Sequence, residues 1–171
     1  MSTSRFPFAI AGAALLGLAL AASGQPAQEH EHSHPADTAL VSKLELDAGK
    51  PWPTDAPLRS GMAAIRTAFD ADHPAIHEGR ESDAQYEALA GRIEREVNSI
   101  VANCKLPAAA DAQLHYVVGD LLQGVALMKG SDAGKSRHDG AARVHAALLA
   151  YGKYFDDPSW PREGSGPSHD H

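Results

Sequence analysis

Three side chains in the middle of the sequence are of the types that bind soft metal ions. Met62 supplies a thioether, Cys104 the only thiol of the chain, and His115 an imidazole. Thioether and thiolate ligands favour Cu(I), and a cysteine–histidine pair also suits Zn²⁺. We therefore predict a copper or zinc site formed by Met62, Cys104 and His115. A ligand thiol at such a site should be accessible in the metal-free protein, with its pKa lowered beside the imidazole.

Each of these residues also has an ordinary structural interpretation. Met62 lies on an apolar stripe and would then be core filler. Cys104 would be an inert buried thiol, and His115 a hydrogen-bonded histidine beside the core. Only their convergence in the fold separates a metal site from three packing residues.

Five further histidines lie near the ends of the chain and form weaker candidate metal sites. Residues 25–39 are a polar tether and residues 161–171 are rich in Gly, Ser and Pro. Neither stretch has the apolar periodicity that builds a core, so we expect both to be disordered. Imidazoles on such tails bind Zn²⁺, Cu²⁺ or Ni²⁺ weakly, or are simply solvated. The five are His30, His32, His34, His169 and His171.

Four segments carry apolar residues at helical spacing. The stripes are Leu58, Met62, Ile65 and Phe69; Tyr86, Leu89, Ile93, Val97, Ile100 and Cys104; Leu114, Val118, Leu121, Val125 and Met128; and Val144, Leu148, Tyr151 and Phe155. Caps and breakers delimit these segments. They are Thr54 or Asp55, His73-Pro74, the Ser82–Gln85 capping box, Leu106-Pro107, Gly130, Ser131 or Ser136, and Asp157-Pro158.

Short connections make consecutive helices antiparallel neighbours. The sequence therefore predicts an all-α fold, an up-down-up-down four-helix bundle over residues 40–160. The start of the first helix, the end of the second, the start of the third and the end of the fourth then share one pole. That pole should hold Met62, Cys104, His115 and Tyr151 at similar depth, one residue from each helix.

The bundle should be preceded by an extended lead-in. Within residues 40–46, apolar and charged side chains alternate for a few positions. Pro51 and Pro53 flank Trp52 further along. Because no second strand is evident, we expect this segment to be strapped along the bundle rather than paired in a sheet.

Two apparent motifs do not indicate binding sites. Residues 130–136 look like a phosphate-binding loop, but the spacing of the glycines is short by one and no strand precedes it. His73 and His77 are four residues apart, yet Pro74 between them should break a shared helix face. We therefore expect both histidines to be solvated loop residues.

The N-terminal residues and the overall charge bear on location and partners. Residues 1–24 combine Arg5, an apolar run and small residues before a cleavage site, which predicts a signal peptide and a periplasmic or secreted protein. A single cysteine cannot form an intramolecular disulfide. The formal net charge of −7 argues against nucleic acid and anionic membranes as partners. A metal ion is the expected partner, and no protein partner is indicated.

Several segments resemble a family of small secreted proteobacterial proteins, sometimes labelled DnrO-like. The segments are LELDAGKPWPTDAPLRSGM at 44–62, IVANCKL at 100–106, Leu114-His115, and YGKYFDDPSW at 151–160. The resemblance covers most of residues 44–160 and implies a small secreted protein, but little about activity.

The expected architecture is also similar to that of cytochrome b562. The resemblance implies a haem held by a methionine early in the first helix and a histidine late in the fourth. Met62 matches the methionine in placement, whereas Tyr151 stands where the histidine is needed and His145 lies nearly two turns earlier. No Cys-x-x-Cys-His motif is present, so covalent haem is excluded. Haem b held by Met62 and His115 is therefore an alternative.

The preferred hypothesis is an exported copper-type metal-binding bundle with a carrier or sequestering role. The alternatives are a haem-b electron-transfer protein and a metal-free structural or binding bundle. We do not expect an enzyme, because no nucleophile–base or carboxylate pair stands at a meaningful spacing.

Overall fold

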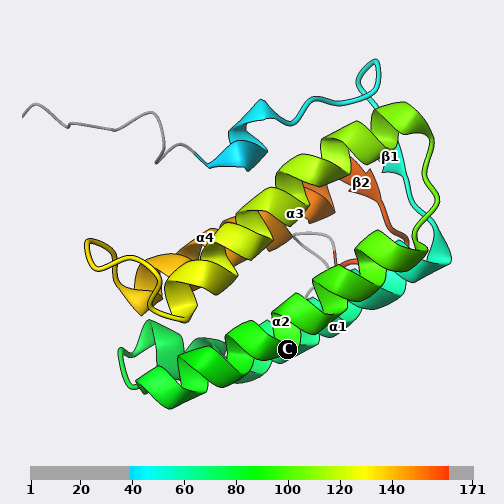
Figure 1. The fold of residues 1–171 in the computed structure, drawn as a ribbon. Helices are drawn as coiled ribbons and strands as arrows, with labels where there is room; N and C mark the ends of the chain where they lie inside the picture. The colour runs from blue at the N-terminus through cyan, green and yellow to red at the C-terminus, as the bar shows by residue number, and fades with distance from the viewer. Residues whose placement is uncertain (1–38, 162–171) are drawn as a thin grey trace, which may run out of the picture. The chain divides into compact units, whose positions relative to one another are not determined.

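The structure, a computed structural model, describes residues 39–161 and confirms the four-helix bundle. The helices are α1 (Ala56–His77), α2 (Asp83–Asn103), α3 (Ala108–Met128) and α4 (Arg137–Tyr154). Consecutive helices pack side by side and run in alternating directions (Figure 1). The predicted signal peptide and the five histidines of the two tails lie outside the described residues.

Local sequence signals set most helix ends where they were expected. Asp55 caps α1, its Oδ1 accepting a hydrogen bond from the Leu58 amide at 2.9 Å. Ser82 and Ser136 each open a reciprocal capping box, for α2 and α4. α2 ends with Cys104 in the C-cap position, and α3 begins directly after Pro107. The starts of α1, α2 and α4 hold because side-chain oxygens accept the hydrogen bonds of amides that have no partner within the first turn of a helix.

The predicted end of α1 was wrong, because the helix continues through Pro74 to His77. A proline inside a helix costs about 3 kcal/mol, since it removes one hydrogen bond and crowds the preceding turn. Here the last turn carries Ile76, which is buried in the core. Beyond the proline, the Glu78 amide still donates to the Pro74 carbonyl at 3.1 Å. Burial of Ile76 and this resumed hydrogen bonding offset the cost, so His73 and His77 lie on one helix.

The core consists of the predicted stripes with one shift on α3. The stripe residues of α1, α2 and α4 are buried, apart from Cys104, which is half-buried. On α3 the inward residue is Val117, whereas Val118 is half-buried. The other four stripe residues of α3 are buried as expected, and the buried face extends to Val117 and Asp120; α3 also packs against the lead-in.

The lead-in does pair with a second strand, contrary to expectation. After a short 3₁₀ helix, η1 (Leu40–Lys43), the chain is extended into β1 (Trp52–Pro53). β1 pairs in parallel with β2 (Phe155–Asp156), which directly follows α4. The register joins Trp52 to Phe155 and Pro53 to Asp156. Such a two-residue pairing leaves no alternating pattern for sequence reasoning to detect.

A buried carboxylate fastens the start of the lead-in to the bundle. Asp120 on α3 is fully buried, and its Oδ2 accepts from the Val41 amide at 2.7 Å. Its Oδ1 accepts from Arg143 Nη1 of α4 at 2.6 Å. The lead-in is therefore strapped along the bundle as expected, through a hydrogen bond to a buried carboxylate whose other oxygen pairs with Arg143.

Within the described part of the chain, no helix combines the length and apolar character needed to cross a membrane.

Candidate functional site

Two of the three predicted metal ligands lie in one pocket at the corner between α2 and α3. Cys104 at the end of α2 and His115 in α3 both line a cavity of about 240 Å³. Asp111 lines the same cavity, one helical turn before His115. Its other walls are apolar and come from Ile100, Val101, Leu114 and Val118. The Leu106-Pro107 turn brings these side chains together, because it folds α3 back against α2.

Cys104 is half-buried and lies close to two carboxylates. Its amide donates to the Ile100 carbonyl at 2.9 Å, which ends α2. The next amide, that of Lys105, donates to Asp55 Oδ2 at 2.6 Å, so the carboxylate that caps α1 also holds the α2–α3 turn. Burial, followed by the negative charges of Asp55 and Asp111, raises the pKa of the Cys104 thiol. The expectation of a lowered pKa beside His115 was therefore wrong.

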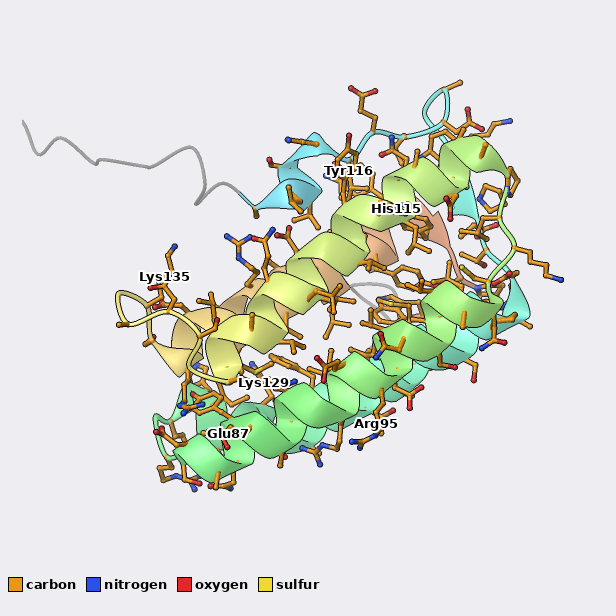
Figure 2. All side chains as sticks on the ribbon, viewed as in Figure 1. Glu87, Arg95, His115, Tyr116, Lys129 and Lys135 are labelled. Atoms are coloured by element: carbon orange, nitrogen blue, oxygen red, sulfur yellow. The ribbon has the colours of Figure 1, made fainter. Side chains whose placement is uncertain are left out.

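His115 has one ring nitrogen engaged and the other available. Nδ1 lies 2.7 Å from the backbone oxygen of Asp111 and 3.6 Å from its Oδ2. Because a carbonyl oxygen only accepts, Nδ1 must carry the hydrogen and donate. In the neutral ring the lone pair is then on Nε2, which is the arrangement that metal-bound histidines commonly show. The side chain lies on α3 (Figure 2) and is 72% exposed, and no hydrogen bond within the described residues engages Nε2.

Met62, the third predicted ligand, lies in the bundle core. It is fully buried and packs in the main hydrophobic cluster. It is not among the residues that line the Cys104–His115 pocket. Its placement fits the core-filler interpretation more closely than a role beside Cys104.

The donor set of the pocket is small. Among residues 39–161, no group of three or more His, Cys, Asp or Glu side chains is arranged to hold a metal ion. Zn²⁺ sites usually take at least three protein ligands in a tetrahedral arrangement. Cu(I) accepts fewer ligands and prefers soft sulfur donors. One thiol and one imidazole therefore fit Cu(I) more closely than Zn²⁺.

Tyr151 occupies the end of α4 where a haem protein of the compared architecture needs a histidine. Its ring is fully buried, with the Phe155 ring at 5.3 Å and the Trp160 ring at 4.8 Å. Its hydroxyl donates to Oδ2 of the buried Asp157 at 3.0 Å. Burial, and then the charge of Asp157, raises the pKa of this phenol. The space is thus filled by a hydrogen-bonded aromatic cluster.

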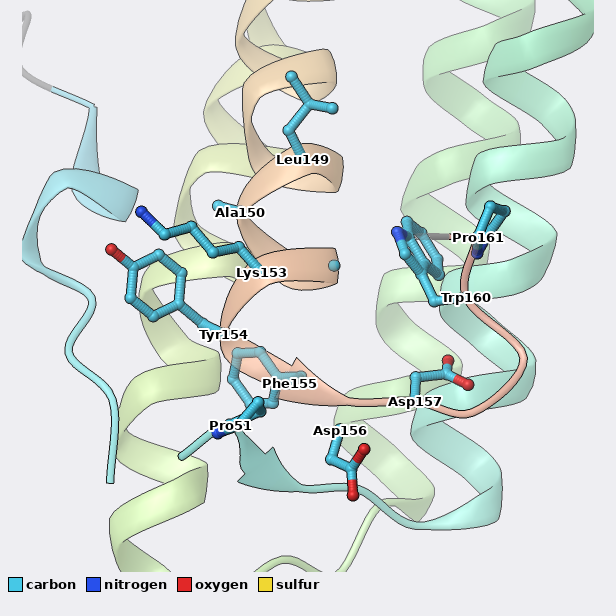
Figure 3. A pocket seen from close by; sticks show the side chains of 11 residues that line it. Pro51, Leu149, Ala150, Lys153, Tyr154, Phe155, Asp156, Asp157, Trp160 and Pro161 are labelled. Atoms are coloured by element: carbon cyan, nitrogen blue, oxygen red, sulfur yellow. The ribbon is translucent and has the colours of Figure 1, made fainter. Parts of the chain in front are cut away.

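A larger groove of about 620 Å³ runs along the end of α4. Figure 3 shows Trp160 on the segment after β2, with Leu149 and Tyr154 on α4. Trp160 packs against Gly152, where an added Cβ would lie 2.4 Å from the indole nitrogen. The guanidinium of Arg66, on α1, lies 5.3 Å from the centre of the indole ring. Trp160 therefore connects α4 to α1 at one end of the groove.

The structure also groups residues that sequence reasoning missed or set aside. Asp111 could have been noticed, because it lies four residues before His115 on the same helix. Asp55 could not, because its contact with Lys105 spans fifty residues. His73 was set aside because of Pro74, yet its ring lies 5.3 Å from the ring of His145 on α4.

No family model matches this chain, and no curated protein or solved structure matches it.

Proposed function

We propose that this protein is an exported metal-binding bundle that takes up Cu(I) in the pocket between α2 and α3, in a carrier or sequestering role. The observation that carries the proposal is that Cys104 and His115, from two different helices, line one cavity. The motifs quoted above also resemble those of the DnrO-like secreted proteins, which is consistent with an exported protein. Export, predicted from residues 1–24, would bring the pocket into contact with metal outside the cytoplasm.

The electrostatics of the pocket support a cation as its ligand. Asp111 and Asp55 both raise the pKa of Cys104, because their negative charges make the electrostatic potential at the sulfur more negative. A bound cation would be attracted by the same carboxylates. Nδ1 of His115 is fixed by the Asp111 carbonyl, so less ring motion has to be lost when Nε2 binds.

The haem alternative receives less support from the positions of its candidate ligands. Met62 is fully buried in the core, whereas His115 is 72% exposed on α3. A haem held between these two would have to displace core residues around Met62. The metal-free alternative is favoured by the groove at the end of α4, which offers an aromatic surface without a metal-binding donor set.

The test of the proposal is the alkylation rate of Cys104 in metal-free and Cu(I)-loaded full-length protein. We expect slow alkylation at pH 7 without metal, because the raised thiol pKa leaves little thiolate. Bound Cu(I) should slow the reaction at least tenfold further, even at pH 9, where the metal-free thiol reacts faster. Equal rates in both states at pH 9 would remove the Cu(I) site and leave the metal-free binding bundle as the better proposal.

Variants then test which residues bind. Cys104→Ser and His115→Ala should each weaken Cu(I) affinity at least tenfold while preserving helicity. Met62→Leu is the matched control, because it conserves core volume, should cost less than about 1.5 kcal/mol and should leave affinity unchanged. A tenfold loss in Met62→Leu would instead restore Met62 as a ligand.

The affinity should also depend on pH in a defined direction. Because the pKa of Cys104 is raised, Cu(I) must displace a proton from the thiol at neutral pH. Cu(I) affinity should therefore rise by about tenfold per pH unit between about pH 7 and 8.5. Cys104→Ser should lose this slope. Competition titrations with a chromogenic Cu(I) chelator at several pH values would measure it.

A further inference from the structure

We infer a second metal site, for Zn²⁺ or Cu²⁺, formed by His73 of α1 and His145 of α4 where these two helices face each other. Their ring centres are 5.3 Å apart and the rings are tilted by 48°. This pair lies in the half of the bundle that contains the end of α1 and the start of α4. Cys104 and His115 lie toward the opposite pole, so the two sites are separate and neither proposal depends on the other.

The spacing of the rings is that of two imidazoles sharing one ion. Metal–nitrogen bonds of about 2.0 Å place the ring centres of two ligating histidines roughly 5–6.5 Å apart. The observed 5.3 Å lies within that range. The residues come from different helices, so a shared ion would bridge α1 and α4. Imidazole ligands suit Zn²⁺ and Cu²⁺, and not selectively Cu(I).

The two imidazole rings pack against a buried side chain and are also exposed enough to rotate. Each packs on the buried ring of Phe69, at 5.6 Å for His73 and 5.4 Å for His145. His145 is exposed and His73 is half-buried, so small side-chain rotations can bring their nitrogens together. Among residues 39–161 no set of three donors is already arranged for a metal. We therefore assign two protein ligands, with water in the remaining positions, and expect Zn²⁺ to bind more weakly than at sites with three or four protein ligands.

The main competing arrangement is a metal ion bound by His73 and His77, both on α1. His77 follows His73 by one turn of α1, and their ring centres are 6.2 Å apart. Two histidines at this spacing on a single helix can themselves chelate a metal. The continuation of α1 through Pro74 makes both arrangements available, and substitutions separate them.

The experiment is a Zn²⁺ titration of the full chain carrying Cys104→Ser and alanine at the five tail histidines. This background removes Cys104 and the tail histidines as competing ligands. Calorimetry should show binding of one Zn²⁺ ion, weakened at least tenfold by His73→Ala or by His145→Ala. His138→Ala, an exposed histidine in the first turn of α4, is the matched control and should leave the affinity within twofold. His145→Gln is a second variant, closer to histidine in volume than alanine, and it should lose the same affinity while the fold is retained.

Stability provides an independent measurement. An ion that bridges α1 and α4 binds only the folded state, so a hundredfold excess over Kd should raise the Tm by roughly 5–10 °C. The increase should disappear in His145→Ala. Absence of Zn²⁺ binding in the background chain would overturn the site. Binding that survives His145→Ala but fails in His77→Ala would also overturn it, by placing the ion on α1 alone.

Discussion

At the scale of single residues, two buried carboxylates attach segments outside the helices to the bundle. Asp120 is fully buried and receives hydrogen bonds from Val41 and Arg143. Asp157 is buried and receives one from Tyr151. Each carboxylate holds a segment outside the helices, the lead-in in one case and the C-terminal segment in the other. Buried charges are tolerated when they are paired in this way.

Tyr151→Phe tests the second of these contacts. Removing the hydroxyl leaves Asp157 Oδ2 with one hydrogen bond fewer and should cost about 1–3 kcal/mol at pH 7. The pKa of Tyr151 is raised in the folded state, so its contribution is complete below the unfolded value near 10 and is lost as pH rises further. The stability difference between wild type and Tyr151→Phe should therefore shrink above pH 10, by up to about 1.4 kcal/mol per pH unit.

Urea unfolding at pH 7, 9, 10 and 11 would measure this difference. Both proteins lose stability at high pH as other groups ionise, which is why only the difference between them is informative. If the free energies of unfolding of wild type and Tyr151→Phe differ by the same amount at pH 9 and pH 11, the phenol does not retain its proton in the folded state.

At the scale of helices, the closest packing is between α3 and α4. An added Cβ at Gly124 would lie 2.7 Å from the Gly140 carbonyl oxygen, and one at Gly140 would lie 2.6 Å from the Gly124 carbonyl oxygen. Both contacts are with backbone, which cannot move aside without separating the helices. The two glycines therefore set the distance between α3 and α4.

Alanine at these glycines should destabilise the protein despite its better helix propensity. We expect Gly124→Ala and Gly140→Ala each to cost about 1–3 kcal/mol, because overpacking outweighs the intrinsic gain. Gly91→Ala on α2 is the matched control, since its Cβ would meet only Arg95 Nη1 at 3.8 Å. That variant should stabilise by about 0.5–1 kcal/mol. Chemical denaturation of the three variants measures the contrast, and equal effects at all three sites would contradict it.

At the scale of the whole described bundle, the chain after α4 completes the packing between α4 and α1. β2 pairs with β1, Asp157 binds Tyr151, and Trp160 reaches Arg66 on α1. Trp160 also has its ring against Tyr151. This short segment therefore packs against the core, to which Phe155 belongs, although it follows the last helix.

Two truncations test this role. A chain ending at Pro161 should keep the helicity and Tm of the full chain, because the residues beyond it have no apolar side chains to bury. A chain ending at Asp156 loses Asp157 and Trp160 and should be less stable by about 3 kcal/mol. Circular dichroism with urea unfolding distinguishes them. Similar stability of the two chains would show that Trp160 contributes little to the fold.

The sequence by itself determined the four helices, most of their ends and the approximate location of Cys104 and His115. Apolar periodicity and capping residues act over a few positions, so they can be interpreted locally. The short Leu106-Pro107 turn then places the end of α2 beside the start of α3. The ends of α1 and α4 were exceptions. The burial of Ile76 outweighs the local effect of Pro74 in α1, and α4 ends at Tyr154 rather than at Asp157-Pro158 because Phe155 and Asp156 form β2 and pair with β1.

Tertiary structure decided which side chains face one another. The rotation of each helix depends on the packing of all its neighbours, and it put Met62 in the core while leaving His115 at the surface. Burial of Cys104, followed by the charges of Asp55 and Asp111, reversed the expected direction of the thiol pKa shift. The contact between His73 and His145 joins helices that are not consecutive in the chain. Such contacts leave no local pattern, because they arise only when distant segments are packed into one core.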